Sequence, residues 1–316
     1  MNADASLTVI VPTFEEPILL ARALTSLRDQ LHESLHVVVV NNGGDPAVVD
    51  QVVGVIASSS SPLASRIIAR HRTKHDARGA VIREALQNVS TPFVAVLDES
   101  QSWQSSCASV AVKRLINNPE TPAVCVGWSI AFEKMIEERV WPRRNDAVTL
   151  KAGDVSLSSL LSGVEIPQHA IVYRVSALTA VDGVNPSFEH LAMWDVNVRL
   201  ATHADVVVEP SPLATLHVLE GTTEEEDERR HAIEAERQQL ISSWIEETLP
   251  GGANKGQCAL DALAHRNRES ELQLLRDENA QLRREIANFN GLSSRALRAM
   301  LQPKKLVRAV QRRTKK

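Results

Sequence analysis

FVAVLDES, residues 93–100, is a short apolar run that ends in two acids, Asp98 and Glu99. A continuous apolar run of this length is typical of a strand that is buried on both faces, as in sheets covered by helices on both sides. The segment therefore predicts a buried strand that delivers a pair of carboxylates at its carboxyl end.

Three similar runs precede this strand, and helical patterns separate them. The runs are LTVIVP (7–12), LHVVVV (35–40) and RIIA (66–69). The expected helices begin at Pro17, cover the valine-rich stretch 48–56 and span residues 78–88. This alternation predicts a mostly parallel α/β sheet with right-handed crossovers.

The carboxyl ends of such strands border the ligand crevice of an open α/β sheet. Asp98 and Glu99 are therefore expected beside the ends of the first two strands, at Pro12–Phe14 and at Asn41–Asn42. A simpler role for Asp98 stays open, because an aspartate at a strand end also caps the following turn. Position alone does not separate the two roles.

The pattern continues with further helices and strands up to about residue 221, the expected end of the first domain. It predicts helices at 105–117 and 193–203, strands at 123–132 and 205–210, and a strand followed by a helix over 170–183. The residues around Trp141, Pro142, Arg143 and Arg144 suggest an irregular stretch.

The remainder of the chain divides by composition into four segments. Residues 222–248 form a strongly charged helix expected to pack on the domain, and residues 249–268 begin with a Pro-Gly-rich linker. Apolar residues then recur at heptad spacing within 269–291, where Asn279 favours a parallel homodimer through 272–289. A single helix folded back on the domain is the alternative.

The last segment, residues 292–316, is a basic amphipathic tail. It contains nine Lys or Arg and no acid from Arg295 to Lys316, although the whole chain has a net charge of -4. Such a segment suits an anionic membrane surface, and a solvated tail is the alternative. Nucleic acid is not expected as a partner, because no base-reading feature accompanies the charge.

Cysteine content and hydropathy limit the compartment. Cys107, Cys125 and Cys258 are few, odd in number and far apart, which fits packing roles in a reducing environment. No apolar stretch approaches the roughly 20 residues of a membrane-spanning helix. We therefore expect a cytoplasmic protein, peripheral to the inner face of the membrane if the tail binds there.

The order and spacing of five motifs resemble family-two glycosyltransferases of the GT-A fold over about residues 6–220. The motifs are LTVIVPTFEE, VVVVNNGGDP, FVAVLDES, VYRVSALTAVDGVNPSF and MWDVNVRLA. The resemblance implies transfer of a sugar from a nucleotide-diphosphate donor to an acceptor hydroxyl, with inversion and with Mg²⁺ or Mn²⁺. A divalent cation held by carboxylates would neutralise the leaving diphosphate, and a separate carboxylate would take the acceptor proton.

The resemblance also assigns roles by position. Its nucleotide-binding positions are Pro12, Thr13, Phe14, Glu16, Asn41, Asn42 and Asp98. Its metal-binding positions are Asp98, Glu99 and His217, and Trp194, Asp195 and Arg199 match the helix near the acceptor.

Several positions depart from the family pattern. Glu15 replaces the usual asparagine, Asn41 and Asn42 replace an acidic pair, and Ser100 replaces the aspartate most directly associated with the metal. The family's Arg-Asn is matched here to Ile82 and Arg83, and its Glu-Asp, which supplies the base, to Ala192 and Met193. Because methionine cannot accept a proton, Asp195 and Glu189 become the candidate catalytic bases, with His190 beside Glu189.

Three functions follow from these observations. The first is an active glycosyltransferase that makes a cell-surface polysaccharide or glycolipid at the cytoplasmic membrane face. The second is a catalytically inactive relative that acts as a binding or assembly partner. The third, an unrelated nucleotide-binding enzyme, has little support, because neither G-x-G-x-x-G after the first strand nor a P-loop is present.

Overall fold

The structure is a computed structural model that describes residues 5–14, 16–136, 139–148, 155–162, 166–219, 223–248, 252–264 and 267. The strands are β1 (Leu7–Thr13), β2 (Leu35–Asn41), β3 (Ile67–His71), β4 (Phe93–Val96), β5 (Gln101–Trp103), β6 (Ala123–Ile136), β7 (Arg139–Val148), β8 (Ile171–Arg174) and β9 (Val207–Leu219). The α-helices are α1 (Pro17–Arg28), α2 (Pro46–Ala57), α3 (Arg78–Leu86), α4 (Cys107–Asn117), α5 (Leu157–Leu161), α6 (Val175–Ala180), α7 (Ala192–Ala201) and α8 (Thr223–Ser243). Short 3-10 turns are η2 (Pro62–Ser65), η3 (Gln168–Ala170) and η4 (Trp244–Glu246).

The described strands form one mixed sheet in the order β3-β2-β1-β4-β8-β6-β9-β5, with β7 paired to β6. β3, β2, β1 and β4 are all parallel, which confirms the predicted parallel half. β8 then runs antiparallel to both β4 and β6, and β9 is parallel to β6. The α/β class and the mostly parallel sheet flanked by helices are as expected from the sequence.

The core lies where the apolar runs cross the sheet. Every residue of β1 and of β4 is buried, so these central strands are covered on both faces. Proline starts two of the helices, Pro17 in α1 and Pro46 in α2, where its missing N–H costs nothing. The Asp45 side chain caps α2 by accepting a hydrogen bond of 2.9 Å from the Ala47 N–H.

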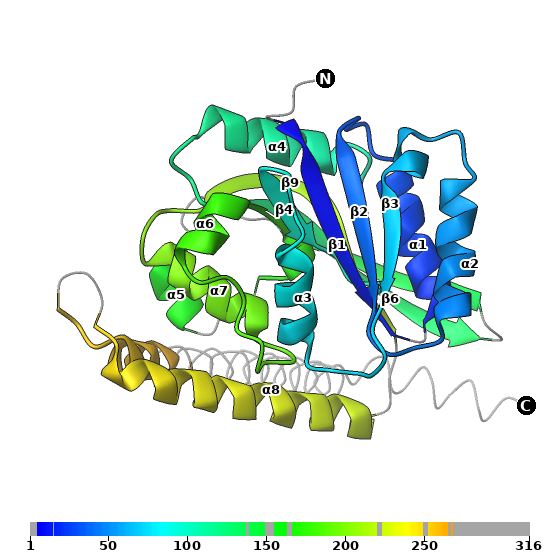
Figure 1. Cartoon of the computed structure of the whole chain (residues 1–316). Coiled ribbons are helices and arrows are strands. Elements are labelled where there is room, and N and C mark those ends of the chain that lie inside the picture. Colours follow the sequence, from blue (N-terminus) through cyan, green and yellow to red (C-terminus); the bar gives the residue numbers. More distant parts are fainter. Residues whose placement is uncertain are drawn as a thin grey trace, which may run out of the picture. The chain divides into compact units, whose positions relative to one another are not determined.

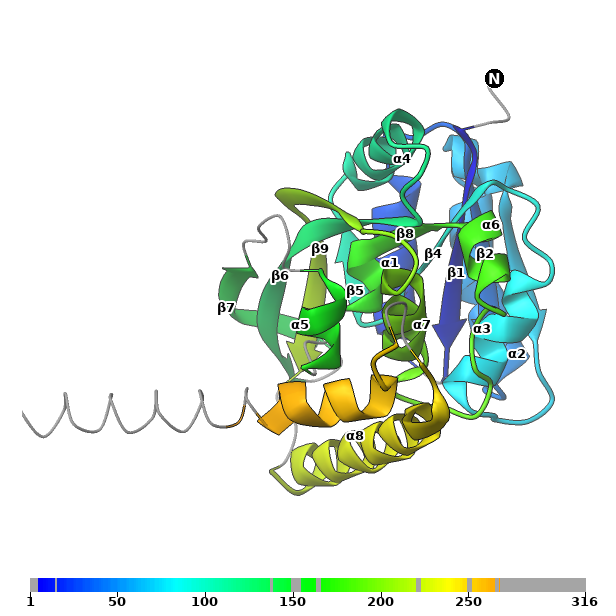
Figure 2. The ribbon, with the colours of Figure 1, turned by 90° about the vertical axis from the view of Figure 1, so that its left-hand side faces the viewer.

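The helices cover the sheet in two groups (Figure 1). α1 packs against α2, whereas α3 and α6 contact α7. Both views place α8 beneath α3 and α7 (Figures 1 and 2). Among the described helices, none combines the length and the apolar character that crossing a bilayer requires.

The stretch predicted to be irregular is in fact β7. It pairs with β6 in a hairpin that lies away from β2 and β3 (Figure 2). The register shifts where Phe132 is opposite Arg144 and Glu133 is opposite Pro142. Proline is tolerated because β7 pairs only with β6 among the described strands, and a bulge relieves the ladder at that point.

Part of the predicted linker 249–268 is also ordered. Residues 255–264 are helical, and Lys255 and Ala259 are buried. The Lys255 ammonium lies 4.4 Å from the centre of the Trp244 ring and 2.7 Å from a carboxylate oxygen of Glu247. The predicted heptad segment 269–291 and basic tail 292–316 lie outside the described residues.

The first turn of α3 packs directly on a distant loop. The Gly79 N–H donates to the Phe188 carbonyl over 2.8 Å, and a Cβ at residue 79 would lie 2.1 Å from the Asn185 carbonyl oxygen. Only glycine allows the two backbones to approach this closely. The start of α3 is therefore fixed against residues 185–188.

Gly79→Ala should destabilise the fold because the new methyl group must push the loop away. We expect a loss of about 1–3 kcal/mol in the free energy of unfolding. The matched control is Gly54→Ala within α2, where a Cβ meets nothing within 4 Å. That variant should be stabilised by up to about 1 kcal/mol.

Denaturant unfolding of the two variants and the wild type measures both effects. Equal stability of the Gly79 and Gly54 variants would contradict the close approach of α3 to the loop.

Candidate active site

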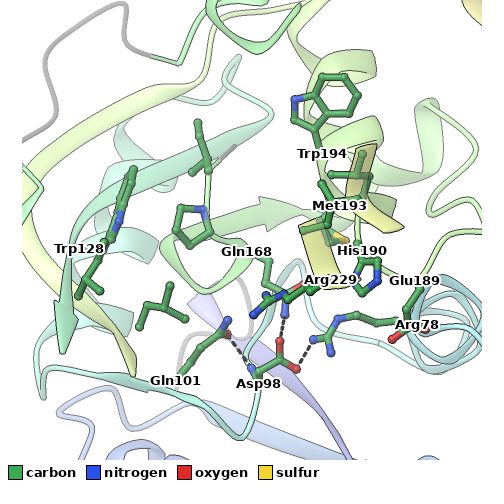
Figure 3. A pocket seen from close by; sticks show the side chains of 16 residues that line it. Arg78, Asp98, Gln101, Trp128, Gln168, Glu189, His190, Met193, Trp194 and Arg229 are labelled. Carbon is green, nitrogen blue, oxygen red and sulfur yellow. Dashed lines mark hydrogen bonds and ion pairs between the residues drawn. The ribbon is translucent and has the colours of Figure 1, made fainter. Parts of the chain in front are cut away.

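A cavity of about 590 Å³ opens beside the carboxyl end of β4. Its polar lining residues are Arg78, Asp98, Gln101, Gln168, Glu189, His190 and Arg229 (Figure 3). Its apolar lining residues are Trp128, Ile130, Ile166, Pro167, Leu191, Met193, Trp194, Leu216 and Ile233. One end is therefore charged, and the rest is mainly aromatic and aliphatic.

Asp98 lies at the charged end with all its polar atoms engaged. One carboxylate oxygen forms an ion pair with the Arg78 guanidinium, and the other accepts a hydrogen bond of 2.8 Å from Gln168. Its backbone N–H donates to the Gln101 side chain over 2.7 Å. These contacts orient Asp98 into the cavity, as Figure 3 shows.

Arg78 connects Asp98 to the second acid of the cavity. It is the first residue of α3, and its backbone N–H donates to Glu189 Oε2 over 2.8 Å. The Glu189 carboxylate thus accepts from the positive end of a helix, an arrangement that stabilises negative charge. In the described part of the chain, Glu189 Oε1 makes no hydrogen bond.

The loop that carries Glu189 is held by α8. The Glu236 carboxylate accepts hydrogen bonds from the backbone N–H groups of Glu189, His190 and Leu191, at 2.8, 2.9 and 2.9 Å. Leu191 precedes α7, so Glu236 supplies the side-chain cap that this helix lacks from its own sequence. Glu189 is therefore placed by contacts on both sides.

Glu99 contacts the end of β1 and is not among the residues that line the large cavity. Its Oε2 accepts a hydrogen bond of 3.1 Å from the Phe14 N–H. Burial raises the pKa of Glu99 to about 7, the Asp98 charge adds to the rise, and the hydrogen bonds from Thr13 and Phe14 oppose it. Glu99 is thus a carboxyl group that stays largely protonated below neutral pH.

The predicted metal ligands are not brought together. The His217 ring contacts Glu133 over 2.7 Å through Nδ1 and Ser102 over 2.8 Å through Nε2. Within the described ranges, no group of three or more His, Cys, Asp or Glu side chains is arranged to hold a metal ion. Because Asp98 is bound by Arg78 and Gln168, the set Asp98, Glu99 and His217 does not fit a cation as assembled here.

The two asparagines predicted to bind nucleotide use their amides on the backbone. Asn41 closes the turn after β2 by exchanging hydrogen bonds of 2.8 Å with Gly44. Asn42 is bonded to both backbone groups of Asp76, at 2.9 and 3.2 Å. Both side chains therefore shape the loops beside the strand ends.

The remaining predicted nucleotide positions lie around the end of β1. Pro12 is buried, whereas Phe14 is exposed and its ring meets His75 edge to face at 5.0 Å. Thr13 and Glu16 line a second cavity of about 220 Å³ between α1 and α2. Of the predicted nucleotide set, Asp98 is the member that lines the large cavity.

The two candidate bases differ in their surroundings. Asp195 is buried and paired with Arg199 on the next turn of α7, at 3.0 and 2.8 Å. It does not line the large cavity, whereas Glu189 does. Helical spacing places the Asp195 carboxylate beside Arg199, and only Glu189 of the two candidate bases lines the large cavity.

Four polar residues of the cavity were not predicted from the sequence: Arg78, Gln101, Gln168 and Arg229. Arg83, which with Ile82 stands where the family shows Arg-Asn, donates to the carbonyls of Asp182 and Val184. Gly79, the residue after Arg78, was the sequence signal that could have indicated Arg78. Glycine allows the close backbone approach that fixes the start of α3, where Arg78 lies. Gln168 and Arg229 had no such signal.

Glu99→Gln should change how stability depends on pH. Between about pH 4.5 and about pH 7 the folded wild type keeps a proton on Glu99 that the unfolded chain loses, so its stability falls as pH rises. Glutamine does not titrate, and the variant should gain stability relative to the wild type between about pH 5 and about pH 8. Melting temperatures across this range measure the difference, and a constant difference would contradict the raised pKa.

Comparison with solved structures gives the fold. S. aureus TarS (residues 1–349) in complex with UDP-GlcNAc is 14% identical, with a TM-score of 0.57, over 82% of this chain and 71% of that one. The mannosyltransferase PcManGT from Pyrobaculum calidifontis, in complex with GDP-Man and Mn²⁺, is 16% identical, with a TM-score of 0.56, over 82% and 74%. No curated protein sequence matches the chain.

Comparison with protein families gives the family. The model described as "Glycosyl transferase family 2" matches residues 8–178, which is more than half of the chain and includes β4, Asp98 and Arg78. The family and fold implied by the sequence motifs are therefore confirmed. The chain belongs to glycosyl transferase family 2 and is a glycosyltransferase with the GT-A fold.

Proposed function

We propose that the large cavity is the transfer site, where a sugar passes from a nucleoside-diphosphate donor to an acceptor hydroxyl. The observation that carries this proposal is the Asp98–Arg78–Glu189 arrangement, in which one arginine contacts both acids at the end of β4. Sugar transfer needs a cationic side chain, because the leaving group becomes anionic, and a carboxylate, because the acceptor proton must be removed. Both kinds of side chain lie together here.

In this proposal Arg78 and Glu189 have separate roles. The Arg78 guanidinium faces the diphosphate and stabilises the charge that develops as the bond from sugar to phosphate breaks. Glu189 Oε1 takes the proton from the acceptor hydroxyl, whose oxygen forms the new bond to the sugar on the opposite face. The diphosphate carries away the electron pair, and displacement in this geometry inverts the sugar carbon.

Asp98 holds Arg78 in place through its ion pair and is itself held by Gln168, and both Asp98 and Gln168 line the donor end. The proposal routes no step through a metal ion, because the predicted ligands are not assembled into one group. Mn²⁺ accompanies GDP-Man in the solved structure of PcManGT, so its effect on this chain is measured directly below.

The acceptor belongs to a cell-surface polysaccharide or glycolipid made at the cytoplasmic membrane face. The support is in the sequence: nine basic and no acidic residues from Arg295 to Lys316 suit an anionic membrane surface. A homodimer through 272–289 would place two such tails together.

Nucleoside diphosphates should raise the melting temperature of the protein. Relatives in solved structures bind UDP-GlcNAc and GDP-Man, so a panel of UDP, dTDP, GDP and CDP covers the alternatives, each with and without Mn²⁺. A ligand at 100 times its dissociation constant adds about 2.7 kcal/mol to stability. Failure of every nucleotide to shift the melting temperature would favour the non-catalytic alternative.

Glu189→Gln should slow transfer by about 100-fold or more while nucleotide binding is retained, since only the proton acceptor is removed. The measured rate is that at which a nucleoside diphosphate is released from its nucleotide-sugar, with water as the acceptor. The nucleotide is the one that raises the melting temperature most. The control is Asp195→Asn, which should lose stability through its pair with Arg199 but keep the rate per folded molecule. The reverse pattern would assign the base to Asp195.

A further inference from the structure

Arg229 is a cation at the cavity that the proposed transfer does not use. It lies on α8 and lines the cavity, and Figure 3 shows its side chain reaching toward the other lining residues. Across the described residues, Arg229 forms neither a hydrogen bond nor an ion pair. Arg229 and the next residue, Arg230, are both exposed, but Arg230 does not line the cavity and pairs with Asp227 at 3.1 Å.

The other charges of the cavity already have partners. Asp98 is paired with Arg78, and Glu189 accepts from the Arg78 backbone N–H. The positive charge of Arg229 is therefore not compensated by the acids that share the cavity with it. A guanidinium in this state is suited to a carboxylate or phosphate, which it can bind through two parallel hydrogen bonds.

α8 presents Arg229 from a fixed position. Arg229, Ile233, Glu236 and Leu240 recur at helical spacing on the face of α8 that meets the domain. Glu236 holds residues 189–191, Leu240 is buried, and the Arg237 guanidinium lies 5.0 Å from the centre of the Trp194 ring. Arg229 is thus two turns from an anchored residue on the same face.

The surroundings of Arg229 favour the acceptor over the donor. α8 lies outside residues 8–178, which the family model matches, whereas Arg78 and Asp98 at the proposed donor end lie inside them. Ile233 on α8 shares the cavity with Trp128, Trp194 and Leu216, an apolar surface of the kind that packs on the face of a sugar ring.

We propose that Arg229 recognises a negatively charged acceptor, through a carboxylate or phosphate group near the hydroxyl that receives the sugar. This inference rests on the proposed transfer site. It predicts that acidic saccharides or sugar phosphates, and not neutral saccharides, are the substrates. Arg229 is a specificity-determining residue in this assignment and takes no part in the chemical step.

The test compares binding of glucuronate, glucose 6-phosphate and glucose by ligand-observed NMR titration. The full-length protein is used, with and without a saturating amount of the nucleotide that stabilises it. Wild type should bind at least one of the two anionic probes about 10-fold more tightly than glucose, with the nucleotide present. Arg229→Gln should remove this preference, whereas Arg230→Gln should keep it.

Arg229→Lys keeps the charge and should retain part of the preference, which separates charge recognition from a folding defect. Equal binding of both anions by wild type and Arg229→Gln, or no preference in the wild type, would overturn the inference. So would a loss of nucleotide affinity in Arg229→Gln, because it would assign Arg229 to the donor diphosphate. If the transfer proposal itself is wrong, the wild type will bind no nucleotide, and this result is distinct from any change in Arg229→Gln.

Discussion

The site depends on the contact between the first turn of α3 and the loop at residues 185–191. Arg78 contributes twice to this contact, through its backbone N–H to Glu189 and through its guanidinium to Asp98. Gly79 allows the close approach that makes both interactions geometrically available. The end of β4, the start of α3 and the entry to α7 are consequently one structural unit, although more than a hundred residues separate its parts.

The parallel half of the fold was predictable because its strands are buried on both faces and so appear as continuous apolar runs. β7 was not predictable, since Pro142 and its neighbouring arginines argue against a strand. β7 accommodates Pro142 because, among the described strands, it pairs only with β6. In addition, the pairing has a bulge opposite Phe132 and Glu133 of β6. The helix at 255–264 was missed because Lys255 is buried against Trp244, a contact that polar composition conceals.

Within the site, local position was predictable and pairing was not. Asp98 at the end of β4 and Glu189 in the loop before α7 both line the large cavity. The partners that decide how these acids behave come from elsewhere: Arg78 from α3, Gln168 from η3 and Glu236 from α8. Asn42 illustrates the same limit, because its amide bonds to Asp76, 34 residues along the chain. A sequence motif shows which side chain is present at a position. Its hydrogen-bond partners, which come from distant parts of the chain, determine whether that side chain can bind a ligand.

The loss of an acid at the start of α7 has a structural counterpart in α8. Met193 lines the cavity, and Glu236 adds a carboxylate at the N-terminus of α7, whose first turn also contains Asp195. Glu189 in turn lies at the N-terminus of α3, so each helix start is stabilised by a carboxylate from another element. Glu236 accepts from the backbone of residues 189–191 and does not line the cavity, so it constrains the loop from outside. Among the described residues, Glu189 Oε1 makes no hydrogen bond. α8, whose Glu236 holds the loop, also carries Arg229, so the position of Glu189 and the charge of Arg229 at the cavity are linked through one helix. This helix lies outside residues 8–178, which the family model matches.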